Sequence, residues 1–266
     1  MVRHALQRIV RQLVRLSIVG VSALACASSS RVEGVAASDV AAAGSVARVL
    51  LVLPLNATMA MPKDLEGPSL AVWAEIENYL RAHGKQLKTV SYQDARRLWL
   101  VSVGRVRRSE QHDAADFATA AKLLTLELRR HTEFDALVVP SVFIQQASIA
   151  GTRAVWDGVT RPIEIRRNHR KIRRNRLHAS RTARSASLHV AVFDASGRMV
   201  HEGQGGLDLL VRAQFDEGLS EDMATSKFWY FERRPEFFDD PALLREGVAK
   251  AFDPFLSPEL RDREPL

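Results

Sequence analysis

Apolar residues along the chain change spacing at intervals, and the changes predict alternating strands and helices. Residues 47–56 form an almost unbroken Val and Leu run that contains Pro54, which predicts a central strand covered on both faces. Residues 69–84 have helical spacing and Gly84 where a helix would end. The apolar positions of that helix are Leu70, Trp73, Ile76, Tyr79 and Leu80.

The alternation continues to about residue 150. Residues 85–91 predict a second strand, and Ser91 with Asp94 resembles a capping box that begins a helix reaching about Val103. A longer helix is expected over residues 110–132, and a third strong strand from about residue 134. This order predicts an α/β fold with a single mixed sheet flanked by helices.

The last third of the chain predicts a β-hairpin and a final helix. Two extended apolar runs flank a turn at residues 194–197, and three glycines in the second arm indicate a bulge or bend. A loop rich in aromatic residues precedes a helix that begins near Asp240. The predicted organisation is a signal peptide (1–25), a flexible tether (26–46), a globular domain (47–256) with a basic insertion (161–184), and a tail (257–266).

The N-terminal residues have the pattern of a secretory signal peptide. Four arginines without an acidic residue precede about ten apolar residues and the small residues Ala23 and Ala25. The apolar run is shorter than the roughly 20 residues that a membrane-spanning helix needs. We therefore expect export, with the chain in the periplasm or on the periplasmic face of the outer membrane.

Cys26 leaves three interpretations of the signal junction open. Ala23-Leu24-Ala25 fits cleavage to a soluble protein, whereas the same residues with Cys26 resemble a bacterial lipobox, in which Cys26 would carry lipid. The lipobox usually has Leu where this chain has Ala23. We favour lipid attachment because Cys26 is the only cysteine, and a lone thiol is a liability in an oxidising compartment. An uncleaved amphipathic anchor is the third interpretation.

The net charge of +7 comes from two short segments. The signal carries +4 and residues 161–184 carry +9, which leaves the rest of the chain at −6. The basic segment is either a solvated loop or a binding segment for anionic polysaccharide or lipid head groups. Nucleic acid is not expected as a partner of an exported chain. The candidate anionic-surface residues are Arg166, Arg167, Arg170, Lys171, Arg173, Arg174 and Arg176.

Motifs for catalysis, metal binding and cofactor binding are not found in the sequence. His189 and His201 flank the hairpin turn and are interpreted as solvent-facing strand residues. Asp239 and Asp240 are interpreted as the N-terminal residues of the last helix. The aromatic residues near 228–238 either pack on the sheet or form an exposed patch for a protein or lipid. No catalytic residue, metal or cofactor is predicted, and a hydrolase with a dispersed Ser/His/Asp triad stays an alternative.

The layout resembles the α/β domain of a group of bacterial envelope lipoproteins, which includes CsgG, LpoB, PelC and the N-terminal domain of TolB. The segments that carry the resemblance are VLLVLPLN, the KTVS strand, FDALVVPSVFI and the turn in VFDASGRMVHEG, over about residues 47–255. The basic segment and the missing Gly-rich signature of the curli pore depart from the group. The resemblance implies an anchored, non-enzymatic interaction or assembly module with an envelope protein partner, which can be an oligomer.

Overall fold

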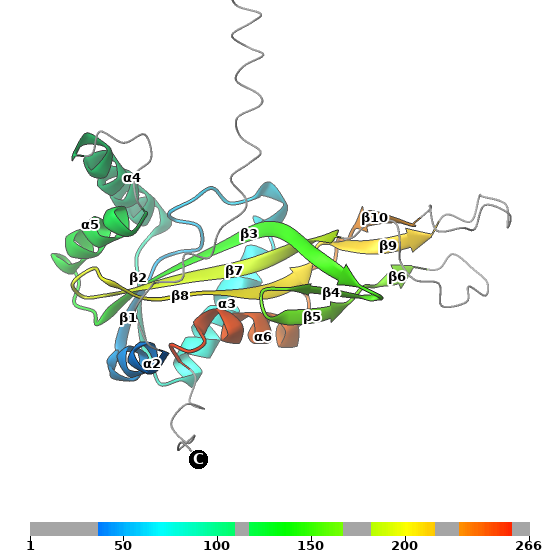
Figure 1. The fold of residues 1–266 in the computed structure, drawn as a ribbon. Coiled ribbons are helices and arrows are strands. Elements are labelled where there is room, and N and C mark those ends of the chain that lie inside the picture. Colours follow the sequence, from blue (N-terminus) through cyan, green and yellow to red (C-terminus); the bar gives the residue numbers. More distant parts are fainter. Residues whose placement is uncertain (1–36, 110–116, 167–181, 216–228, 257–266) are drawn as a thin grey trace, which may run out of the picture. The chain divides into compact units, whose positions relative to one another are not determined.

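The computed structural model describes residues 37–109, 117–166, 182–215 and 229–256. A seven-stranded mixed sheet lies between helices on both faces (Figure 1), which confirms the predicted α/β fold, C-terminal hairpin and final helix. The helices are α2 (Ala37–Val46), the 3-10 helix η1 (Lys63–Leu65), α3 (Ser69–Ala82), α4 (Tyr92–Ser109), α5 (Phe117–Arg129) and α6 (Pro241–Phe252). The strands are β1 (Val49–Val52), β2 (Gln86–Thr89), β3 (Ala136–Ala150), β4 (Arg153–Trp156), β5 (Val159–Pro162), β6 (Ile165–Arg166), β7 (Thr182–Asp194), β8 (Met199–Leu209), β9 (Val211–Phe215) and β10 (Trp229–Arg233).

Strand β1 lies in the interior of the sheet, as its unbroken apolar run predicts. It is parallel to β2 on one side and to β3 on the other. Leu50 and Val52 belong to a core with α3 and α6, whereas Leu51 and Leu53 belong to a core with α4 and α5. Successive residues of β1 therefore supply two separate hydrophobic layers, which is the reason why the run lacks polar positions.

The antiparallel half of the sheet is built on two long strands. Strand β3 pairs with β7 from Ala136 opposite Asp194 to Ser148 opposite Thr182. Strand β8 follows β7 through the predicted turn, in which the Gly197 N–H donates to the Asp194 carbonyl (2.9 Å). At its far end β3 also pairs with β4, which continues into β5.

A second, three-stranded sheet of order β10-β9-β6 was not predicted. Trp229 and Tyr230, expected in an aromatic loop, instead begin strand β10, which pairs antiparallel with β9. Phe237 and Phe238 are each 4% exposed, so the interpretation that the aromatic residues pack against the domain is confirmed for these two. Phe228 lies outside the described residues.

Helix α2 differs from the flexible tether expected up to residue 46. Val40 and Ala47 are buried against the core that contains α3 and α6. The Lys85 ammonium donates to the carbonyls of Gly44 (2.6 Å) and Ala47 (2.8 Å) at the end of α2, and burial lowers its pKa. The composition of residues 37–46 resembles a linker because Ala and Ser are small, but a small residue can also pack closely.

Asp135 fixes the start of β1. Its Oδ2 accepts hydrogen bonds from the backbone N–H groups of Arg48 and Val49, both at 2.8 Å. The bond from Val49, which stabilises the ionised carboxylate, is the main reason why the pKa of Asp135 lies below its usual value.

Helix α3 confirms most of the predicted stripe: Ile76 and Leu80 are buried, and Trp73 and Tyr79 pack against the core. Leu70, expected in the core, is 75% exposed, whereas Val72, Ile76 and Leu80 are fully buried. The helix begins at Ser69, and Leu70 lies in its first turn on the side away from the sheet.

Glycines in β8 let α6 approach the sheet so closely that backbone atoms of the helix and the strand are in contact. A Cβ on Gly205 would lie 1.8 Å from the Gly247 carbonyl oxygen of α6, and one on Gly203 would lie 2.3 Å from the Ala251 carbonyl oxygen. The predicted bulge is also present, because Ala186 pairs with Asp208 while Ser187 pairs with Gly206. The glycines therefore provide close packing in addition to the irregularity in strand pairing.

Candidate functional site

The predicted site residues lie largely outside the part of the chain that the structure describes. Cys26 is one of them, and so are the six cations from Arg167 to Arg176. Arg166 is the last residue of β6, whose backbone pairs with β9. Lipid attachment at Cys26 and anion binding by the basic segment therefore remain predictions.

Two other cations of the 161–184 segment have described side chains, and they differ sharply. Arg161 is 5% exposed; it pairs with Glu246 and donates to the Leu243 carbonyl (3.2 Å), so it joins β5 to α6. Arg184 is half exposed and donates to the Asp64 carboxylate (3.2 Å). Arg161 thus belongs to the structural core, while Arg184 stays accessible.

The hairpin histidines do not share one environment. His201 is 3% exposed and its Nε2 lies 2.8 Å from the Ala251 carbonyl, so its interpretation as a solvent-facing residue is wrong. His189 is partly exposed and contacts Glu202 at 3.0 Å. His201 faces α6, which an isolated hairpin pattern cannot reveal.

Burial makes His201 a pH-dependent contributor to stability. Desolvation is the main cause of the lowering of its pKa, so the unfolded chain binds a proton at a higher pH than the folded chain does. We expect the free energy of unfolding to fall as the pH drops below about 6.5, the ordinary histidine pKa. The free energy of unfolding, measured with urea at pH 7.5 and 5.5, should fall less between the two pH values in His201→Gln than in the wild type. The matched control is His131→Gln, at a 70% exposed side chain, and an equal reduction there would contradict the prediction.

Asp240 caps α6, as its position before Pro241 predicts. Its Oδ1 accepts from the Ala242 N–H (2.9 Å) and the Leu243 N–H (3.4 Å). Among the described residues, no group of three or more His, Cys, Asp and Glu side chains is arranged to hold a metal ion. Within the same residues, no helix has the length and apolar character needed to cross a bilayer.

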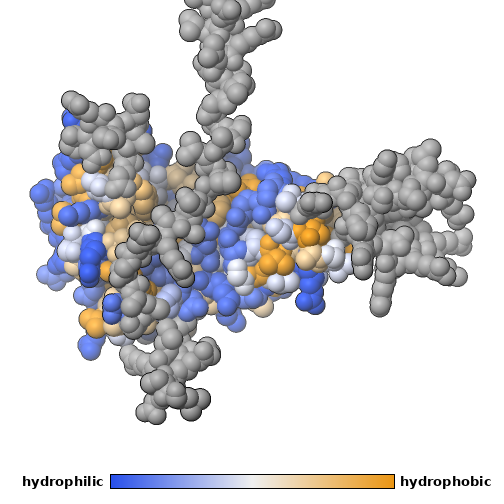
Figure 2. Space-filling view, in the orientation of Figure 1, coloured by the Kyte–Doolittle hydropathy of each residue, from blue (hydrophilic) through white to orange (hydrophobic). Residues whose placement is uncertain are grey.

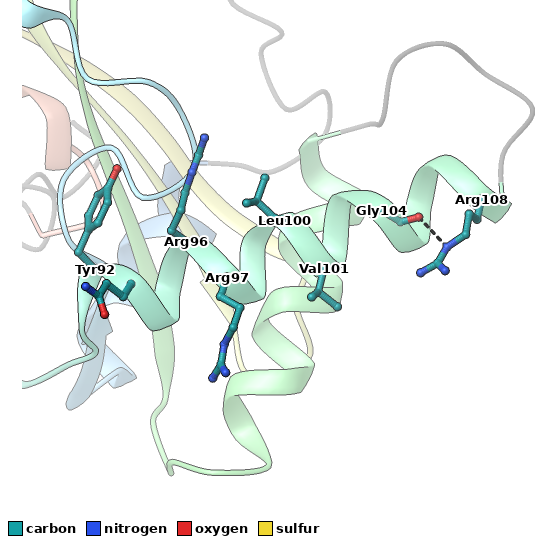
Figure 3. Close-up of a pocket in the computed structure, with 8 residues that line it drawn as sticks. Tyr92, Arg96, Arg97, Leu100, Val101, Gly104 and Arg108 are labelled. Carbon is teal, nitrogen blue, oxygen red and sulfur yellow. Dashed lines mark hydrogen bonds between the residues drawn. The ribbon is translucent and has the colours of Figure 1, made fainter.

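The outer face of α4 exposes large apolar side chains. Tyr92 is 47% exposed, Leu100 56% and Val101 43%. An open groove of about 630 Å³ follows this face of the helix. In Figure 3, Tyr92, Arg96 and Leu100 point to one side of the helix, while Arg97 and Val101 point to the other. Apolar and hydrophilic side chains are mixed over the end of the domain that carries α4 and α5 (Figure 2).

Arginines surround these apolar residues. Helix α4 contains five arginines and one acidic residue, Asp94. Arg97 pairs with Asp94 (3.2 Å) and Arg105 with Glu127 of α5 (3.5 Å), whereas Arg96 and Arg108 donate to the backbone carbonyls of Ala57 (3.2 Å) and Gly104 (3.0 Å). We call the outer side of α4, with its exposed apolar residues and arginines, the α4 face. It combines apolar area with a strong excess of positive charge.

A second concave site lies between η1, β7 and β10. It is a cleft of about 290 Å³ in which Asp64 is placed between Arg184 and Arg233. Asp64 lies 3.2 Å from the Arg184 guanidinium and 3.3 Å from that of Arg233. Phe231 and the buried Phe237 contribute apolar side chains to its wall. We call it the Asp64 cleft.

Comparison with known proteins adds no assignment: no family model, curated protein or solved structure matches the chain.

The α4 face lies at residues that the sequence analysis did not single out, whereas the Asp64 cleft brings Asp64 together with Arg184 of the basic segment and with residues of the aromatic segment near 228–238. Five arginines within residues 92–109 are a visible signal, but the same residues also predict an ordinary amphipathic helix. The Asp64 cleft has no local signal, because Asp64 and Arg184 are 120 residues apart.

Proposed function

We propose that the chain is an exported, lipid-anchored envelope protein that acts as a non-enzymatic interaction module. Cys26 carries the lipid, and the α4 face binds an acidic protein partner. The observation that carries the proposal is the exposure of Tyr92, Leu100 and Val101 among the arginines of α4. An apolar patch with charged neighbours is typical of surfaces that bind another protein.

Charge decides what kind of partner suits this face. A second copy that docked α4 against α4 would bring five arginines toward five others, with one acidic residue on each helix. Juxtaposed like charges disfavour an interface, whereas an acidic surface would be attracted to it. Exposed leucine and valine would then be covered at the centre, and the arginines would pair at the rim.

Two other functions are candidates. Binding of an anionic polymer or membrane surface through residues 161–184 is the second candidate, and the accessible guanidinium of Arg184 at the end of this segment favours it. A hydrolase with a dispersed triad is the third. The described contacts of His189 and His201 go to Glu202 and to a backbone carbonyl, which does not favour a serine nucleophile at either histidine.

Photo-crosslinking in cells that export the chain tests the proposal. A photoreactive phenylalanine analogue at position 100 should give a crosslinked product with a protein of acidic net charge. The same analogue at position 70 is the matched control, because Leu70 is also a helical leucine and is 75% exposed. Charge reversal in Arg107→Glu with Arg108→Glu should reduce the product at position 100 about ten-fold.

Each other outcome contradicts a defined part of the proposal. Equal products at positions 70 and 100 would remove the α4 face as a specific surface. A crosslinked product between two copies of the chain, or with lipid alone, would contradict the proposal that the partner is an acidic protein. Metabolic labelling with palmitate that persists in Cys26→Ser would remove Cys26 as the anchor and leave the docking surface unaffected.

A further inference from the structure

We infer that the Asp64 cleft is a binding site for one carboxylated sugar unit of an acidic saccharide. The inference is independent of the α4 face and rests on three observations. The cleft pairs two accessible guanidiniums with one carboxylate, it has an aromatic wall, and its volume suits a single sugar ring. It deepens the second candidate function, because it gives an anionic polymer a defined subsite.

The positive charge of the cleft is only partly neutralised. Asp64 contacts one nitrogen of Arg184 and one of Arg233, and the side chains of these arginines are 50% and 62% exposed. A guanidinium has five N–H donors in a planar fork, so each arginine keeps donors for a further carboxylate. Two cations against one anion leave a net charge of +1, which favours an anionic ligand.

The wall of the cleft adds a second requirement on the ligand. Phe231 is half-buried in the wall, and Phe237 lies beside the Arg233 guanidinium, which is 6.0 Å from the ring centroid. The accessible part of Phe231 offers an apolar surface for the C–H face of a sugar ring, while Phe237 supports Arg233 from below. The volume of about 290 Å³ is at the small end of ligand pockets, which span roughly 300–1,000 Å³.

Asp64 distinguishes a sugar acid from phosphate. Asp64 repels the single charge of a sugar carboxylate less than the two charges of a phosphate dianion, and it can also accept hydrogen bonds from sugar hydroxyls. Gln146 and Thr182 also line the cleft and can both donate and accept. The cleft therefore combines cationic donors for a carboxylate, an acceptor for hydroxyls and an apolar face.

Paired strands hold the polar residues of the cleft. Arg184 and Gln146 project from β7 and β3, which pair directly at these two positions in the long antiparallel ladder. Arg233 is the last residue of β10, opposite Val211 of β9. Sites on paired strands hold their side chains more rigidly than sites on loops, which lowers the cost of ordering them on binding.

Titration calorimetry with the full chain tests the inference. Trigalacturonate is the probe, maltotriose is its neutral counterpart, and inorganic phosphate is the anion without a sugar. We expect binding of trigalacturonate, no measurable binding of maltotriose or phosphate, and weaker binding at higher salt. Arg233→Gln and Arg184→Gln should each weaken trigalacturonate binding about ten-fold, because each removes a charge-assisted pair.

The matched control is Arg153→Gln, an exposed arginine on β4, which should bind trigalacturonate as the wild type does. Binding of trigalacturonate unchanged in Arg233→Gln and Arg184→Gln, or absent in the wild type, would overturn the inference. Equal binding of maltotriose would show that the carboxylate is not recognised, and binding of phosphate would make the cleft a plain anion site.

The same variants separate the cleft from the basic segment. One outcome would overturn the cleft as the binding site and support the 161–184 segment. In it, long polygalacturonate binds Arg233→Gln as tightly as the wild type, and trigalacturonate binds neither protein. Loss of both probes in Arg233→Gln supports the cleft as the subsite. Removal of the basic cations from 166 to 176 should weaken binding of the polymer and leave the affinity for trigalacturonate within two-fold of the wild type.

Discussion

Gly205→Ala is expected to lower the free energy of unfolding by about 3 kcal/mol, at the upper end of the cost of overpacking. The added Cβ would lie 1.8 Å from the Gly247 carbonyl oxygen and 2.9 Å from the Ala251 nitrogen. Both neighbours are backbone atoms of α6, so no side chain can rotate away. The helix must move off β8, and the core residues Val248 and Phe252 lose contacts with it. Urea unfolding measures the loss.

Gly104→Ala is the matched control, since the chemical change is identical. Gly104 lies within α4, and a Cβ there meets no heavy atom within 4 Å. Alanine should stabilise the helix by about 0.5–1 kcal/mol. The two substitutions should therefore change stability in opposite directions. A small loss in Gly205→Ala, comparable with the change in Gly104→Ala, would mean that α6 does not need its close approach to β8.

The elements of the main sheet could be predicted because their signals are local. The unbroken run around Leu51 requires two covered faces, and the turn at residues 194–197 requires a hairpin. Ser91 and Asp94 form the expected contacts at the start of α4: the Ser91 hydroxyl donates to the Asp94 carboxylate (2.7 Å), and the Asp94 N–H donates to Ser91 (3.1 Å). Such patterns depend on neighbours within a few residues.

The second sheet and α2 could not be predicted in the same way. Strand β10 pairs with β9 across the 216–228 segment, and β6 adds only two residues in parallel. Strands this short have too few positions to show an alternation. Helix α2 has a weak apolar stripe, and its position depends on Lys85, which is 38 residues from Ala47.

The candidate sites differ in how far the sequence could indicate them. Periodicity in α4 separates a buried stripe at Ala95 and Trp99 from the opposite face, but Leu100 and Val101 alone would pass as core residues. Only the structure shows that they are exposed. The Asp64 cleft depends on η1, β7 and β10 meeting, and no spacing rule relates residues so distant in the chain.

Asp208→Ala should destabilise the protein by about 3 kcal/mol, because it removes the buried carboxylate that joins the Arg234 guanidinium to the Phe238 backbone. Asp208 is 3% exposed, and its carboxylate accepts from the Arg234 guanidinium (3.0 Å) and from the Phe238 N–H (3.0 Å). The Arg234 side chain is only 20% exposed, so water cannot fully replace the lost carboxylate. Urea unfolding of the variant measures this loss.

Asp64→Ala provides the comparison that separates a buried ion pair from an accessible one. Asp64 also contacts two arginines, but its side chain is 35% exposed and those of Arg184 and Arg233 are more so. Its removal should cost less than about 1 kcal/mol. In Asp208→Ala, the second change Arg234→Met should recover about half of the loss, since it removes a guanidinium that has lost its buried carboxylate and keeps only the more exposed Glu164 as an ion-pair partner. Equal losses in Asp208→Ala and Asp64→Ala would show that Asp208 does not hold Arg234 and Phe238 in place. The wall of the Asp64 cleft would then have to be fixed by the packing of Phe237 and by strand β10, which carries Phe231.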